Sequence, residues 1–166
     1  TLEVVSAAGV VLPAYLFCPL ARVKGPLLLL LQPGGRTRQW REEGMCHALA
    51  AGGVTVCAFD VRGIGDLTPE AGRGNPFYTL PHAQEEAYAW ASLMLGQPLL
   101  GQRVTDIVAM AQAVSAYRRA ERTILAAVGA MAVPALPAAV PVKVRVGMSA
   151  TASTSTWTVP VRSGRA

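Results

Sequence analysis

The sequence predicts an α/β fold in which an N-terminal antiparallel hairpin leads into parallel strands connected by crossover helices. Leu27–Leu31 is a run of five leucines without polar alternation, which is typical of a strand covered by helices on both faces. Two further runs rich in β-forming residues follow at Val54–Phe59 and Arg122–Val128. Segments with helical spacing separate the three runs, and this alternation favours a parallel sheet with right-handed crossovers.

The N-terminal segment predicts the hairpin. Short runs of β-forming residues at Leu2–Val5 and Val10–Phe17 flank Ala8-Gly9, which is typical of a tight turn. Pro13 has no backbone N–H to donate, so it predicts an edge position for its strand.

Helices are expected between the buried strands. Glu42–Ala51 has helical spacing and ends at Gly52-Gly53, a C-terminal capping signal. A long polar loop follows, from Asp60 to Pro81. Two more helices are predicted, at about His82 to Leu95 and at about Arg103 to Arg119, and the second has an apolar face.

A chain of 166 residues, 52% of them hydrophobic, accommodates one domain with a buried core. We expect residues 1–136 to form an incomplete domain. Residues 137–166 are rich in Pro, Ala, Ser and Thr, so we expect a poorly packed extension, in which Val142–Val146 could form a trailing strand. The charge-free stretch Thr123–Val142 is interrupted by Gly129 and three prolines, which predicts a buried strand and a broken segment rather than a membrane span.

The net charge of +5 belongs to the C-terminal segment. Residues 1–121 hold ten basic and ten acidic side chains, whereas residues 122–166 hold five basic side chains and no acidic one. The neutral body therefore argues against a nucleic-acid-binding surface. The three cysteines are widely spaced and the two histidines complete no ligand cluster, so we expect reduced thiols, no metal site and no cofactor. They are Cys18, Cys46, Cys57, His47 and His82.

Two loops at the carboxyl ends of predicted strands contain paired glycines. After Leu31, Gly34 and Gly35 allow a sharp turn whose N–H groups could face an anion or a developing oxyanion, although an ordinary turn has the same pattern. After Phe59, Asp60 could pair with Arg62 or cap loop N–H groups. Gly63 and Gly65 permit positive φ in this second loop. A dinucleotide fingerprint needs a further glycine or alanine, where Thr68-Pro69 stand instead, so we interpret the loop as a turn that shapes a pocket.

The third loop stands where a nucleophile elbow of pattern G-x-S-x-G would lie. Gly129 matches the first position, but the nucleophile position is Met131 and the second glycine is Val133. A thioether has no ionisable proton and cannot form an acyl-enzyme. The sequence therefore predicts that this loop is inactive as a serine site.

Together these motifs resemble α/β-hydrolases of the acetyl xylan esterase and dienelactone hydrolase type. The resemblance extends over residues 2–136 and is greatest from Val54 to Val114, which follows QPGGR and precedes VGAMAVPAL. It implies a small ester or carbohydrate ligand, and it is closest to members that have lost the elbow serine. It also implies oxyanion donors at Gly34 and Gly35, and a pocket-shaping turn made by Asp60, Arg62, Gly63 and Gly65.

The sequence also departs from that family. Its catalytic order is Ser, then Asp or Glu, then His, but no acidic residue or histidine follows Met131. His47 and His82 both precede the elbow. A complete domain would need two or three further strands, and their absence predicts an exposed sheet edge prone to self-association.

Three functional hypotheses follow. The first is a non-catalytic or partial α/β-hydrolase-like domain; within the same fold, Ser149 in Gly147–Thr151 could instead be the nucleophile, one residue short of an elbow. The second is a phosphate- or nucleotide-binding module that uses Gly34 and Gly35. The third is a basic interaction protein whose C-terminal segment binds anionic polymers.

Overall fold

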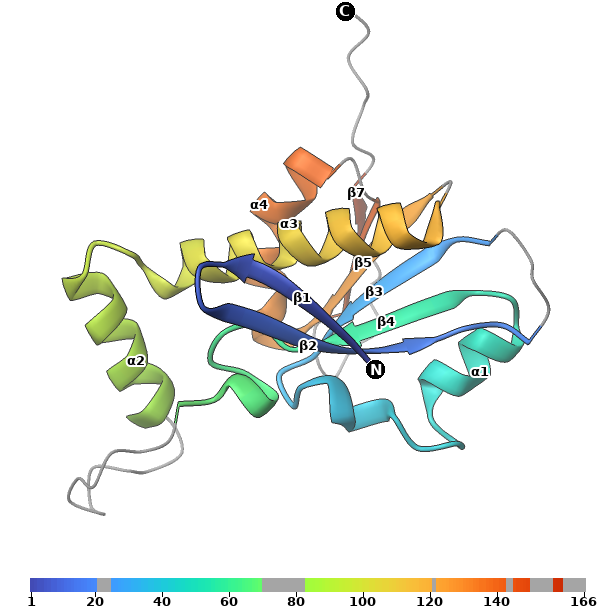
Figure 1. The fold of residues 1–166 in the computed structure, drawn as a ribbon, viewed down its shortest axis with the longest axis horizontal. Helices are drawn as coiled ribbons and strands as arrows, with labels where there is room; N and C mark the ends of the chain where they lie inside the picture. The colour runs from blue at the N-terminus through green and yellow to red at the C-terminus, as the bar shows by residue number, and fades with distance from the viewer. Residues whose placement is uncertain (21–24, 70–82, 121, 143–144, 150–156, 160–166) are drawn as a thin grey trace, which may run out of the picture.

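The computed structural model describes residues 1–20, 25–69, 83–120, 122–142, 145–149 and 157–159. These residues form a seven-stranded mixed sheet with strand order β1-β2-β4-β3-β5-β6-β7 and helices on both faces (Figure 1). The predicted α/β class is confirmed. The strands are β1 (Leu2–Ala7), β2 (Val10–Phe17), β3 (Leu27–Leu31), β4 (Thr55–Phe59), β5 (Thr123–Val128), β6 (Arg145–Ser149) and β7 (Trp157–Val159).

The N-terminal hairpin forms as predicted, but the edge position predicted from Pro13 is wrong. Strand β2 lies inside the sheet, antiparallel to β1 on one side and to β4 on the other. The Pro13 carbonyl accepts a hydrogen bond from the Asp60 N–H at 3.1 Å, just beyond the last residue of β4. The imide nitrogen of Pro13 faces the same side, where the β2–β4 ladder has ended, so the missing N–H removes no ladder bond.

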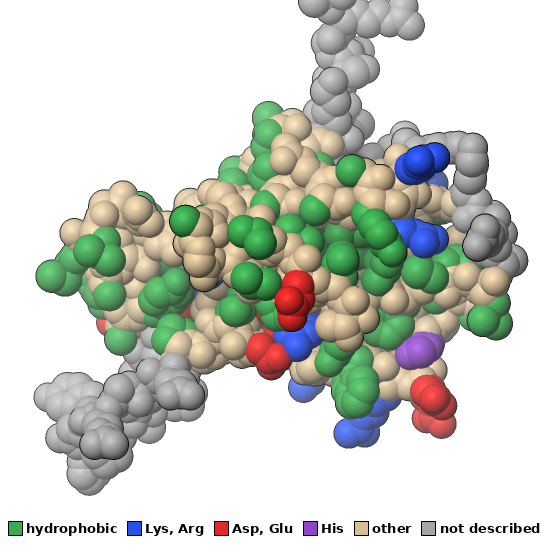
Figure 2. Space-filling model, viewed as in Figure 1, with side chains coloured by type: hydrophobic (Ala, Val, Ile, Leu, Met, Phe, Trp, Pro, Cys, Tyr) green, Lys and Arg blue, Asp and Glu red, His purple; other side chains and the backbone are tan. Residues whose placement is uncertain are grey.

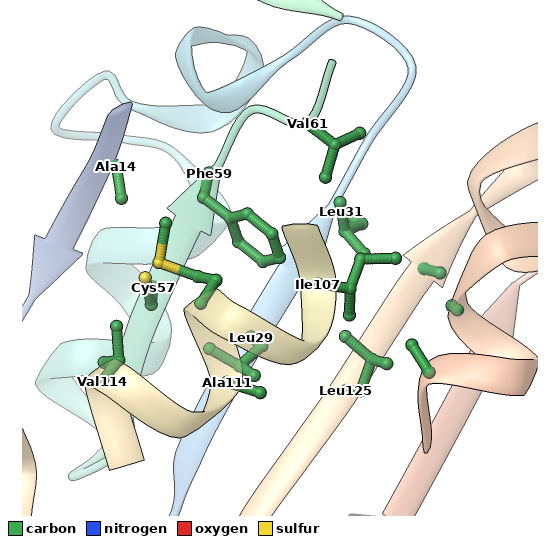
Figure 3. Packing of buried hydrophobic residues seen from close by; sticks show 14 of the residues in the cluster. Ala14, Leu29, Leu31, Cys57, Phe59, Val61, Ile107, Ala111, Val114 and Leu125 are labelled. Carbon is green, nitrogen blue, oxygen red and sulfur yellow. The ribbon is translucent and has the colours of Figure 1, made fainter. Parts of the chain in front are cut away.

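The three central strands are parallel, as predicted, and their alternating side chains create two apolar layers. Leu27, Leu29 and Leu31 face α3 and α4 and belong to the larger core, together with Phe59 and Leu125. Figure 3 shows Leu29, Leu31 and Phe59 against Ile107 and Ala111 of α3. A smaller cluster of Leu30, Cys46, Val56 and Ala58 lies on the other face, under α1. The five-leucine run is apolar throughout because helices cover both of its faces.

The helices are α1 (Met45–Ala51), α2 (Ala83–Met94), α3 (Leu99–Arg118) and α4 (Ala132–Val142), and short 3₁₀ turns occur at Arg36–Gln39, Gly65–Leu67 and Gly129–Met131. The predicted helices are confirmed in place. Helix α3 begins four residues earlier than expected, directly after Pro98, which supplies an extended residue at its N-terminal boundary.

The structure differs from the expectation of a poorly packed extension at residues 137–142. These residues complete α4, and Ala138 and Ala139 are buried in the larger core. Helix α4 packs closely on α3, and its alanines permit that approach. This packing outweighs the hydrogen bonds lost at Pro137 and Pro141.

Strand β6 lies parallel to β5 and is followed by the antiparallel strand β7. The trailing strand therefore exists, three residues later than expected. Over the described part of the chain, no helix has the length and apolar character needed to cross a membrane.

Candidate functional site

The carboxyl ends of β3, β4 and β5 bring the three candidate loops to one edge of the sheet. Leu31 pairs with Ala127, so the loops that follow β3 and β5 begin side by side. A Cβ built on Gly129 would lie 3.6 Å from Cγ of Pro33, which places the two loops in contact. Ligands of open α/β sheets bind at this edge.

Asp60 and Arg36 form the centre of this edge. Asp60 is buried at the end of β4, and its Oδ1 accepts the Arg36 N–H at 2.6 Å. Its Oδ2 pairs with Nη1 of Arg36 and accepts the Asp66 N–H at 3.2 Å. The prediction that Asp60 caps loop N–H groups is therefore confirmed, whereas the suggested pairing with Arg62 is wrong.

The buried Arg36 guanidinium is held from three sides. Its Nη2 also pairs with the exposed Asp66 carboxylate at 2.5 Å. Its Cζ lies 5.0 Å from the ring centroid of Tyr15, on which Trp40 stacks. Burial by itself lowers the pKa of Arg36, but the hydrogen bonds and negative charges of Asp66 and Asp60 outweigh it, and the pKa is raised. Arg36 therefore remains charged.

Two glycines allow the chain to approach the Asp60 carboxylate. Gly35 has φ 74°, and a Cβ there would lie 2.9 Å from Oδ1 of Asp60. Gly65 has φ 59°, and a Cβ there would overlap the same carboxyl group. Both positions require glycine because of conformation and space together.

The predicted oxyanion donors are only partly available. The Gly35 N–H donates to the Gln32 carbonyl at 3.0 Å, and the Arg36 N–H that follows is bound to Asp60. Gly34 lies beside Arg38, whose Cδ would be 3.2 Å from a Cβ at that position. The two glycines therefore form the turn that delivers Arg36 to Asp60.

Arg62 pairs with a residue that the sequence did not single out. Asp106 on α3 is fully buried, and Nη2 of Arg62 reaches its Oδ1 at 2.8 Å while Nε reaches Oδ2 at 3.0 Å. Asp106 also accepts the Arg62 N–H at 3.0 Å and the Ser6 hydroxyl at 2.7 Å. This pair joins the β4 loop, helix α3 and strand β1.

Arg103 fixes the same loop from its other side. Its Nε donates to the Arg62 carbonyl at 2.9 Å, and its Nη1 pairs with Glu85 of α2 at 2.6 Å. Gly63, with φ 79°, would place a Cβ 2.8 Å from Nη2 of Arg103. Gly63 and Gly65 both have the predicted positive φ.

The turn after β5 has no attacking group at either candidate position. The residue with positive φ between strand and helix is Gly129, at φ 57°. Met131 lies two residues later, at the end of a 3₁₀ turn, and its side chain is buried in the larger core. A nucleophile elbow instead holds its nucleophile exposed on a strained turn.

The remaining candidates are Ser149, His47 and His82. Ser149 is the last residue of β6 and is paired in register with Val128, at the same sheet edge, but the residues after it lie outside the described part of the chain. His47 is exposed on α1, and its ring lies edge-on to Phe17 with centroids 4.9 Å apart. His82, unlike His47, is outside the described residues. No cluster of three His, Cys, Asp or Glu suited to a metal occurs in the part of the chain that is described.

The buried thiol of Cys57 gives a pH prediction. Burial, with a smaller contribution from Cys18, raises the pKa of Cys57 to about 12. Between about pH 9 and about pH 12 the folded state keeps a thiol proton that the unfolded state releases. The contribution of Cys57 to the free energy of unfolding is therefore complete below about pH 9, and it falls by about 1.4 kcal/mol per pH unit toward pH 12. We expect the difference in unfolding free energy between wild type and Cys57→Ala, measured by urea denaturation, to narrow over that range. A difference independent of pH would contradict this.

Comparisons by sequence identify no relative. No protein-family model matches the chain, and no curated protein matches it. The fold nevertheless matches solved structures over 86–90% of this chain. This is an α/β-hydrolase-like fold.

Three solved structures show the likeness. Est1E from Butyrivibrio proteoclasticus, solved with ferulic acid bound, is 15% identical over 86% of this chain, with a TM-score of 0.54. XC6422 from Xanthomonas campestris, an α/β serine hydrolase without a lid, is 19% identical over 90%, with a TM-score of 0.52. Epoxide hydrolase VrEH1 from Vigna radiata is 21% identical over 89%, with a TM-score of 0.50.

The chain spans 48%, 58% and 36% of the lengths of these three proteins. At such low identities the likeness concerns the fold alone. The predicted resemblance to α/β-hydrolases is thereby confirmed for the architecture, and the catalytic residues of the three proteins are not carried over to this chain.

Proposed function

We propose that this chain is an esterase-related α/β-hydrolase domain, of the acetyl xylan esterase and dienelactone hydrolase type, that does not hydrolyse esters with the residues it contains. The observation that carries the proposal is the turn after β5, where Gly129 has the positive φ and Met131 is buried. Neither residue offers an oxygen or a thiolate to a carbonyl carbon. A small ester or carbohydrate is the expected ligand class.

A supporting observation is that the carboxylates at the sheet edge already have partners within the chain. The Asp60 carboxylate accepts hydrogen bonds from Arg36 and from the Asp66 backbone N–H. The Asp106 carboxylate accepts hydrogen bonds from Arg62 and from the Ser6 hydroxyl. A carboxylate that holds a buried arginine is poorly suited to orient a histidine, as an esterase triad requires. We therefore assign these two acidic residues the role of holding the loops in place.

Hydrolysis of p-nitrophenyl acetate tests the proposal. We expect wild-type protein to give no saturable turnover above the spontaneous hydrolysis measured without protein. Saturable turnover would contradict the proposal. If that turnover were lost in Ser149→Ala, Ser149 would be the nucleophile.

A phosphate- or nucleotide-binding function is the second candidate. It is disfavoured because the Gly35 and Arg36 N–H groups already have acceptors in Gln32 and Asp60. A rise in melting temperature with inorganic phosphate or ATP would support it over our proposal.

A further inference from the structure

Helix α2 carries a large exposed apolar patch. Trp90, Leu93 and Met94 follow helical spacing along its outer face, and Leu95 and Leu100 continue the patch through the turn into α3. All five side chains are between 48% and 86% exposed. Hydrophobic side chains gather over this part of the molecule in Figure 2, where Figure 1 draws α2 at the left end.

The patch contains no charge. No Asp, Glu, Lys or Arg occurs between Ala87 and Gln102. The nearest acidic residue, Glu86, accepts a hydrogen bond from Nε1 of Trp90 at 3.3 Å. Arg103 is buried and pairs with Glu85. A surface of this kind faces water at a cost and is typical of an interaction site.

The inner side of α2 is already engaged with the domain. Tyr88 donates its hydroxyl to Oε1 of Gln102 at 3.4 Å, and the Arg103–Glu85 pair joins α2 to α3. Ser92 is buried on this side. Helix α2 is therefore held in place by contacts with α3, and its opposite face is exposed to solvent.

The exposed area is sufficient for association. Fully exposed Leu, Met and Trp side chains present roughly 120–250 Å² each, so the five exposed fractions amount to on the order of 500 Å² of apolar surface. Monomeric proteins rarely expose larger patches. Two such patches in contact would remove on the order of 1,000 Å² from water, which reaches the lower limit for a specific interface.

We propose that the outer face of α2 is a contact between two copies of this chain, related by a two-fold axis that pairs α2 with α2. The five apolar side chains carry no charge and are complementary to a second copy of themselves, and an antiparallel pairing keeps the two Glu86 side chains at opposite ends of the contact. A lipid surface fits less well, since helices that lie on membranes carry Lys or Arg beside the apolar face, whereas α2 carries Glu85 and Glu86. The contact is independent of the proposed function.

Sedimentation velocity over a hundred-fold range of protein concentration tests the contact. We expect wild-type protein to show a reversible monomer–dimer equilibrium. Met94→Lys and Trp90→Lys should each raise the dimer dissociation constant at least tenfold. Neither substitution is expected to destabilise α2. Trp90→Lys places a positive charge four residues after Glu86, and Met94→Lys places one at the C-terminal end of the helix.

Val140→Lys is the matched control. Val140 is 72% exposed near the C-terminal end of α4, as Met94 is 86% exposed at the end of α2, so the substitution adds the same charge outside the patch. We expect Val140→Lys to leave the dimer unchanged, and circular dichroism should show native helix content in all variants.

Three results would overturn the contact. Wild-type protein could be monomeric at every concentration. The dimer could persist in both α2 variants and be lost in Val5→Lys, which would place the contact at the edge strand β1 instead. Alternatively, monomeric wild-type protein could sediment with neutral phosphatidylcholine vesicles while the two α2 variants do not, which would make a lipid surface the partner.

Discussion

Replacing Asp60 by Asn is expected to lower the free energy of unfolding by about 3 kcal/mol or more. The substitution keeps the size of the side chain but removes the charge opposite the buried guanidinium of Arg36. The amide can accept hydrogen bonds through one oxygen only, while the carboxylate now serves the N–H groups of Arg36 and Asp66 as well as Arg36 Nη1. Urea denaturation with circular dichroism measures the loss.

Asp66→Asn is the matched control for this variant. Asp66 pairs with the same guanidinium but is 64% exposed, so solvent screens the interaction and we expect a loss below about 1 kcal/mol. Equal losses for the two variants would show that burial does not set the cost, contrary to our interpretation of this cluster.

Asp106→Asn is expected to have a comparably large effect, about 3 kcal/mol or more. Asp106 is fully buried and accepts hydrogen bonds from three nitrogens of Arg62 and from the Ser6 hydroxyl. The Asn amide group would turn a donor toward Arg62 or Ser6, which leaves polar hydrogens facing each other in a dry site. Thermal and urea unfolding would both register the loss.

Glu85→Gln is the control for Asp106→Asn, because it also removes a carboxylate charge that pairs with an arginine. Glu85 is 54% exposed opposite Arg103, so we expect little change in unfolding free energy.

An Arg62→Met/Asp106→Leu double variant should be more stable than Asp106→Asn, because it removes the uncompensated charge as well as its partner. A double variant as unstable as the single one would argue against a charge effect.

Local patterns predicted most of the architecture. The five leucines of β3, the β-forming runs of β4 and β5 and the turn at Ala8-Gly9 all indicated the correct elements. These signals are local, because the alternation of side chains along a strand and the stop at a glycine depend on near neighbours. Pro13 and the prolines of α4 misled for the same reason, since their tolerance depends on which distant strand or helix lies beside them.

Residue pairing at the candidate site could not be predicted in this way. Asp60 had a basic residue two positions away in Arg62, yet its partner is Arg36, 24 positions earlier. Arg62 in turn pairs with Asp106, 44 positions later, within a helix whose sequence signal is its apolar face. A one-dimensional pattern assigns an ion pair to the nearest opposite charge, and the fold assigns it to the neighbouring strand or helix.

The sequence by itself determined that no hydroxyl or thiol stands at Met131, because the identity of a residue fixes its chemistry in any conformation. It also determined the two-sided burial of β3, because a strand of five leucines is stable only when both faces are dry. Tertiary structure alone decided that Gly129 adopts the positive φ, that Met131 turns into the core, and that α4 survives its prolines. These outcomes depend on how closely α3, α4 and the sheet approach, and that distance is set by side chains far apart in the chain.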